Sequence, residues 1–240
     1  MHLAYRIQET RDEAPPAPAF FRVGAISAAA SGVLALLGNM AHGPADVSAA
    51  GLHHLAGNGH FGIYRADHFL LALALIFAVC GYAAIADAIK GRGAHWGRFA
   101  MLLAQLGAAV IMVALGIDGF AMIGVARAWA HAAGSDQQMI FHVAQALWSA
   151  FVGIFALGVF VFFGCAPLVA GLGLRHEPHI ARWLAPAAIA GGIVGLALGV
   201  VLAFVPITFG TYAMVFGTSS SLLAAWMTGA GLHIWRTAGS

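Results

Sequence analysis

Six long apolar runs constrain this chain more than any other feature of its sequence. A helix that spans a bilayer needs about 20 consecutive, mostly apolar residues. Runs of that length cover residues 20–41, 69–89, 99–125, 139–169, 183–205 and 212–235. Hydrophobic residues make up 61% of the chain and charged residues only 8%, whereas about a quarter of a soluble domain is charged. The sequence therefore predicts an all-α, polytopic integral membrane protein with six transmembrane helices.

The basic residues predict how these helices are oriented. Only Arg65 and Arg127 fall on one side of the predicted bundle. The other nine of the eleven basic residues fall on the opposite side: Arg6, Arg11, Arg22, Lys90, Arg92, Arg98, Arg175, Arg182 and Arg236. By the positive-inside rule both termini are cytoplasmic, in a bacterial-type inner membrane or a plasma membrane. The net charge of +2 reflects this loop asymmetry and does not indicate nucleic-acid binding.

The chain divides into three predicted parts. Residues 1–19 form a polar cytoplasmic arm, residues 20–236 the six-helix bundle, and residues 237–240 a short tail. The arm contains Glu9, Asp12 and Glu13, and the apolar run that follows is too long for a signal peptide. We therefore expect that run to remain in the protein as its first spanning helix.

Histidines gather on the predicted outer side, at or beyond the helix ends. Seven of the twelve fall there: His42, His53, His54, His60, His68, His131 and His142. Asp118 lies inside the third span, not far below the same level. A carboxylate within a span costs about 2.5–3.5 kcal/mol on insertion scales, so it usually faces the bundle interior and has a partner there. These residues predict a polar pocket that opens to the outer face.

A redox cofactor or a metal is the first interpretation of this pocket. His142, Gln145 and Ser149 share one helix face, and a ligating imidazole is usually oriented by a carboxylate or amide at its second nitrogen. Haem held by two imidazoles would suit His142 with His42 or His68, with Asp118 and Gln145 as the orienting groups. Helices one and two are joined by a long outer loop that we predict for residues 43–67. Copper or zinc would suit a set drawn from this loop: His53, His54 and His60. The chain would then be a membrane subunit that takes part in electron transport.

Three other interpretations remain open. The polar residues could simply hydrogen-bond across helices and hold the bundle together. Asp118 and His142 could form a proton or quinone site, because intramembrane His and Asp side chains relay protons in pumps. The chain could also transport a metal or small solute, with uptake that depends on Asp118.

A structural accessory subunit of a larger membrane complex is the main alternative from a different class. Gly191, Gly195 and Gly199 form a face at four-residue spacing that lets another helix approach closely, either in this bundle or in another subunit. The bilayer, and other membrane subunits, are the partners that this sequence predicts.

Common catalytic motifs are absent from the sequence. It contains no HExxH, Walker A or GxSxG motif, and the two cysteines, Cys80 and Cys165, have no CxxC spacing. The sequence does not decide whether the protein is an enzyme.

Overall fold

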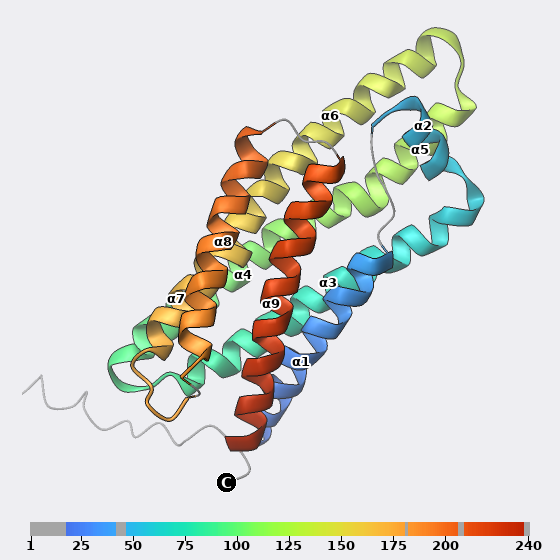
Figure 1. Cartoon of the computed structure of the whole chain (residues 1–240). Helices are drawn as coiled ribbons and strands as arrows, with labels where there is room; N and C mark the ends of the chain where they lie inside the picture. The colour runs from blue at the N-terminus through green and yellow to red at the C-terminus, as the bar shows by residue number, and fades with distance from the viewer. Residues whose placement is uncertain (1–17, 42–46, 181, 206–208, 238–240) are drawn as a thin grey trace, which may run out of the picture.

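The protein is an elongated bundle of helices (Figure 1). The computed structural model describes residues 18–41, 47–180, 182–205 and 209–237, and these parts contain helices and short turns but no strand. The all-α prediction is therefore confirmed for the described residues. The helices are α1 (Pro18–Ala41), α2 (Ala49–Ala56), α3 (Asn58–Ala88), α4 (Ala94–Gly116), α5 (Met122–His131), α6 (Gly134–Gly158), α7 (Ala166–Leu174), α8 (Leu184–Phe204) and α9 (Phe209–Thr237). A 3-10 turn, η1 (Gly91–Gly93), and two π-helical segments, η2 (Ile117–Ala121) and η3 (Val159–Cys165), complete the order.

Five helical segments of the described chain are long and apolar enough to cross a bilayer. They are Ala19–Met40, Gly62–Ala88, Gly91–His131, Gly134–Leu174 and Leu184–Phe204. Their apolar side chains are exposed along much of their length, as in Val23, Leu102 and Ile193. Lipid can cover such side chains, whereas a soluble protein rarely exposes so large an apolar surface. Five of the six predicted spans are confirmed in this sense, as is the multi-pass membrane class.

The sixth predicted span forms a helix, α9, but it is not among these five. The polar run from Thr218 to Ser221 lies in its middle and lowers its apolar character. α9 packs along α1, where Gly231 lies against the backbone of Ala25 and Gly32 against that of Ala224. Because of this pairing, the start of α1 and the end of α9 lie at the same end of the bundle (Figure 1).

Two of the apolar segments are much longer than a bilayer is thick. Gly91–His131 and Gly134–Leu174 each contain 41 residues, which corresponds to roughly 60 Å of helix against a hydrocarbon core of about 30 Å. Each is interrupted near its middle by a π-helical segment, η2 or η3. The far ends of these segments, α5 and the start of α6, lie at one end of the bundle together with α2 and the start of α3 (Figure 1).

Residues 47–67, the described part of the outer loop predicted for residues 43–67, are largely helical. Ser48 caps α2 by accepting a hydrogen bond of 2.9 Å from the backbone N–H of Gly51, and α3 begins at Asn58 rather than near residue 69. The sequence pattern missed these helices because Gly and His are poor helix formers in isolation. Tertiary packing explains them, since Leu52 and Leu55 of α2 are buried.

The buried residues form two adjoining cores. The larger core runs through the bundle and includes an aromatic group from α6 and α9, in which Phe151, Phe155 and Tyr212 pack with ring centroids 5.3–5.6 Å apart. The smaller core lies where α2, α3, α5 and α6 meet: Leu52, Leu55, Tyr64, Met122, Ile123, Ala126 and Ala144. α2 thus covers the junction of α3 and α5.

The predicted glycine face of α8 is used mostly inside the bundle. A Cβ added at Gly195 would overlap with the backbone of Phe163 in η3, and one at Gly199 would lie 2.8 Å from the backbone of Phe160. Gly191, in contrast, has open space around it. Two residues of this face therefore serve close packing between α8 and η3.

This difference between neighbouring glycines gives a matched pair of variants. We expect Gly195→Ala to destabilise the protein by about 1–3 kcal/mol, because α8 and η3 must move apart to admit the methyl group. Gly191→Ala should leave stability unchanged or slightly raised, since Ala favours helix. Thermal unfolding in detergent would test this, and equal midpoints for the two variants would contradict the described packing.

Candidate functional site

A buried polar cluster joins α3 to η2. Tyr64, Asp67 and His68 share one face of α3, because residues three and four positions apart are neighbours on a helix. Asp118 comes from η2, the π-helical segment on the facing helix. Asp67, His68 and Asp118 are each only 1% exposed. We call these four residues the His68 cluster.

Hydrogen bonds link every member of the His68 cluster. The Nδ1 atom of His68 lies 2.6 Å from Oδ1 of Asp67 and 2.7 Å from the carbonyl oxygen of Tyr64. Its Nε2 atom lies 3.3 Å from Oδ2 of Asp118. The hydroxyl of Tyr64 donates to Oδ1 of Asp118 over 2.7 Å. Both ring nitrogens of His68 are therefore engaged, each with a different carboxylate.

This geometry restricts where protons can lie. A backbone carbonyl only accepts hydrogen bonds, so the short contact with the carbonyl of Tyr64 requires that Nδ1 of His68 carries a hydrogen. Nε2 and Oδ2 of Asp118 must then share one further proton, held either by the imidazole or by the carboxyl group. Without that proton, two acceptors would face each other across 3.3 Å.

A glycine brings η2 close enough for this contact. A Cβ added at Gly119 would overlap with the ring of His68, at its Cγ atom. Gly119 and Asp118 are both buried, and both lie in the π-helical segment. Because Gly119 has no side chain, the imidazole of His68 can pack directly against η2 and reach the carboxylate of Asp118.

On the side of α2 and α5, the His68 cluster adjoins the smaller core. Tyr64 belongs to the smaller core and contacts the ring of His68, with ring centroids 4.6 Å apart. Beside it, the guanidinium of Arg65 lies 5.6 Å from the centre of the Phe120 ring. The cluster is therefore shielded from water on this side by α2, α5 and the side chains beneath them.

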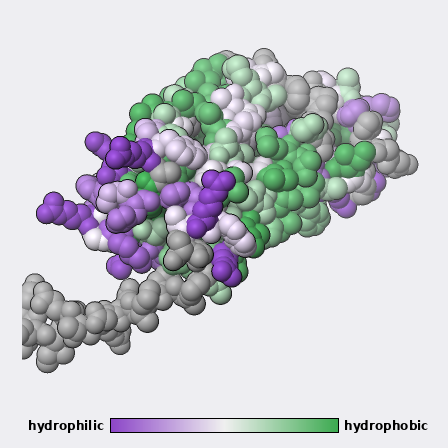
Figure 2. Space-filling view, turned by 60° about the horizontal axis from the view of Figure 1, so that its bottom comes forward, coloured by the Kyte–Doolittle hydropathy of each residue, from purple (hydrophilic) through white to green (hydrophobic). Residues whose placement is uncertain are grey.

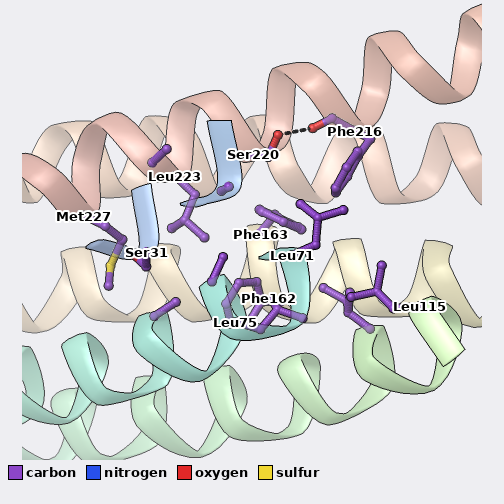
Figure 3. A pocket seen from close by; sticks show the side chains of 15 residues that line it. Ser31, Leu71, Leu75, Leu115, Phe162, Phe163, Phe216, Ser220, Leu223 and Met227 are labelled. Atoms are coloured by element: carbon purple, nitrogen blue, oxygen red, sulfur yellow. Dashed lines mark hydrogen bonds between the residues drawn. The ribbon is translucent and has the colours of Figure 1, made fainter. Parts of the chain in front are cut away.

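A small cavity lies in the interior of the bundle, and Figure 3 shows the side chains that line it. Its volume is about 40 Å³. Leu71 and Leu115, which line it, lie one helical turn from His68 and Asp118. The remaining lining is mostly apolar, with Ser31 and Ser220 as its polar members, and both of these hydroxyls donate to carbonyls of their own helices. The cavity gives side chains near the cluster room to move.

Two of the predicted site residues come together in the structure, and the others do not join them. His68 and Asp118 are in contact and buried. His142 and Gln145 lie on an exposed face of α6 and bond to each other, with Nδ1 of His142 3.2 Å from Oε1 of Gln145. His42 lies outside the described residues.

The residues predicted to bind copper or zinc lie on or next to α2. His53 and His54 are exposed on α2, His60 lies in the first turn of α3, and the side chain of His60 is outside the described part of the structure. Within the described residues, no group of three or more His, Cys, Asp or Glu side chains is arranged to hold a metal ion. The metal and haem assignments stay predictions.

Sequence reasoning missed two members of the cluster, Tyr64 and Asp67. Both fell in the segment predicted to be a loop, so their helical spacing to His68 was not considered. The pattern Tyr-x-x-Asp-His would have placed all three on one face if α3 had been extended to its true start.

Comparison with known proteins adds no further assignment. No protein family, curated protein or solved structure matches this chain.

Replacing the glycine beside His68 tests the geometry of the cluster. We expect Gly119→Ala to displace the imidazole, break its contact with Asp118 and destabilise the protein by about 1–3 kcal/mol. Gly116→Ala is the control, because a Cβ at Gly116 meets no atom within 4 Å. Thermal unfolding of both variants measures the effect, and a Gly119→Ala variant as stable as wild type would show that the contact is not as close as described.

Proposed function

We propose that this chain is a six-span membrane protein with both termini on the cytoplasmic side. The distribution of Lys and Arg supports this orientation, and the pairing of α9 with α1 supports a sixth span. The membrane would be a bacterial-type inner membrane or a plasma membrane.

Within this protein, we propose that the His68 cluster takes up and releases a proton and that this event changes the contact between α3 and η2. The observation that carries the proposal is the pair of Nε2 of His68 and Oδ2 of Asp118, which needs one proton to be a hydrogen bond. Such coupling is what a proton-driven transporter requires, and a small solute or an ion would be its substrate.

The physical cost of burying these groups supports a functional role. Ionisable side chains within a membrane bundle are expensive and usually mark proton or substrate pathways. If the shared proton is lost, Nε2 of His68 and the carboxylate of Asp118 are two hydrogen-bond acceptors that face each other in the apolar interior. A buried polar group without a hydrogen-bond partner costs about 1–3 kcal/mol. Release of the proton therefore favours separation of α3 from η2, and rebinding favours their contact.

The cofactor hypothesis finds less support in the described geometry. Both nitrogens of His68 are engaged by Asp67, Tyr64 and Asp118, and His142 lies on an exposed helix face. A haem bound between these two imidazoles would require His68 to lose a buried hydrogen bond. The accessory-subunit hypothesis also finds less support, because Gly195 and Gly199 already pack against η3 and so do not offer a surface to another subunit.

Infrared difference spectra of the reconstituted protein, recorded between about pH 5 and pH 10, would test the proposal; this range includes a histidine whose titration is displaced from its ordinary range by neighbouring carboxylates. We expect reversible imidazole and carboxyl bands together with a change in the backbone amide band. Asp118→Asn and His68→Gln should abolish these changes, because each removes one side of the proton-sharing pair.

Two exposed residues of α6 provide the matched controls. Asp136→Asn and His142→Gln remove the same kinds of group outside the cluster and should leave the backbone change in place. If the wild-type cluster shows no titration, or titrates without any backbone change, the His68 cluster is a permanent link between helices and the proposed coupling is wrong.

A further inference from the structure

A hollow lies at the end of the bundle that carries most of the basic residues. Its volume is about 260 Å³. It is formed where the start of α1, the ends of α3 and α9, and the segment before α8 meet: Phe21, Ala88, Lys90, His179, Ile180, His233, Ile234 and Thr237. Figure 2, which brings this end forward, shows hydrophilic side chains gathered here beside a largely hydrophobic surface.

Groups that favour an anion converge on the hollow. Lys90, His179 and His233 come from three different parts of the chain and can all donate hydrogen bonds to an anion. None of the described lining residues is acidic. The nearby carboxylate of Glu177 accepts a hydrogen bond of 2.6 Å from the backbone N–H of Lys90.

Hydrogen bonds also hold the walls of the hollow together. The contact of Glu177 with Lys90 ties the segment before α8 to the end of α3. The backbone N–H of Ile180 donates to the carbonyl of Glu177 over 3.2 Å, which shapes the turn that carries His179. The positions of Lys90 and His179 are therefore set by the same small network.

The floor of the hollow is apolar and leads towards the bundle interior. Phe21, Ile180 and Ile234 line it next to the polar groups. A narrower space continues beneath them, lined by further apolar residues: Ile85, Leu174, Leu184 and Ala230. The hollow therefore presents polar groups that can bind an anion beside an apolar surface.

The helix ends explain only part of this arrangement. Lys90 and His233 lie near the C-terminal ends of α3 and α9, where positive charge offsets the helix dipole. That effect accounts for basic residues at these positions, but it accounts neither for the hollow between them nor for its apolar floor.

We infer that this hollow binds the head group of an anionic phospholipid. Basic pockets between membrane helices on the side rich in Lys and Arg are suited to such head groups. The phosphate would accept hydrogen bonds from Lys90, His179 and His233, while the adjoining glycerol and acyl carbons lie on Phe21, Ile180 and Ile234. This inference does not rest on the proposed role of the His68 cluster, which lies near the other end of α3.

Native mass spectrometry of the full chain in detergent tests the inference. The protein is titrated with dioleoylphosphatidylglycerol and, separately, with dioleoylphosphatidylcholine, which has no net charge. We expect tighter binding of the anionic lipid. Lys90→Ala should weaken that binding by about fivefold, the effect of roughly one lost positive charge near a membrane surface. His233→Ala should weaken it less, because it removes one hydrogen-bond donor from the hollow.

Arg92→Ala is the matched control, because Arg92 is an exposed basic residue at the same end that does not line the hollow. It should bind the anionic lipid as wild type does, and thermal unfolding confirms that each variant is folded. Equal binding of the two lipids, or an equal loss in Arg92→Ala, would overturn the inference. Displacement of the anionic lipid by millimolar inorganic phosphate would also overturn it, since the site would then bind a soluble anion.

Discussion

Two carboxylates and one imidazole lie buried in an apolar helix bundle, and the rest of the site depends on how their charges are balanced. Asp67 and Asp118 face opposite nitrogens of His68, so the imidazole can serve both only while a proton is shared with Asp118. In a low-dielectric interior an unpaired charge costs several kcal/mol, and removing one partner of a buried pair is strongly destabilising. The proton shared by His68 and Asp118 stabilises the contact between α3 and η2, so loss of this one proton would weaken that contact.

Close helix packing makes this contact possible. Gly119 admits the imidazole ring against η2, and Gly195 and Gly199 admit η3 against α8. In both long apolar segments, these close contacts fall in a π-helical stretch, η2 or η3. Such stretches are frequent at functional sites. Beside the cluster, the apolar cavity lined by Leu71 and Leu115 leaves room for a rearrangement that a fully packed core would resist.

Much of the fold could be predicted from the sequence, because long apolar runs in a chain with so few charged residues are typical of membrane-spanning helices. The runs located five spans, although three of these spans begin or end five to eight residues away from the predicted bounds. The position of Asp118 indicated a buried partner, which is His68. The start of α3 could not be predicted, since tertiary packing of α2 rather than local propensity stabilises it, and Tyr64 and Asp67 were missed with it. The π-helical register of η2 has no sequence signal of its own, so the pairing of Asp118 with one particular histidine required the structure.

The hollow near Lys90 and the His68 cluster lie towards opposite ends of α3, so lipid contact and proton binding can be examined separately. The central claim concerns His68 itself, and nitrogen-15 NMR of histidine-labelled protein in lipid tests it most directly. We predict that Nδ1 of His68 is always protonated and that the Nε2 signal shifts strongly in Asp118→Asn. A His68 signal with Nδ1 unprotonated, or one that Asp118→Asn leaves unchanged, would contradict it.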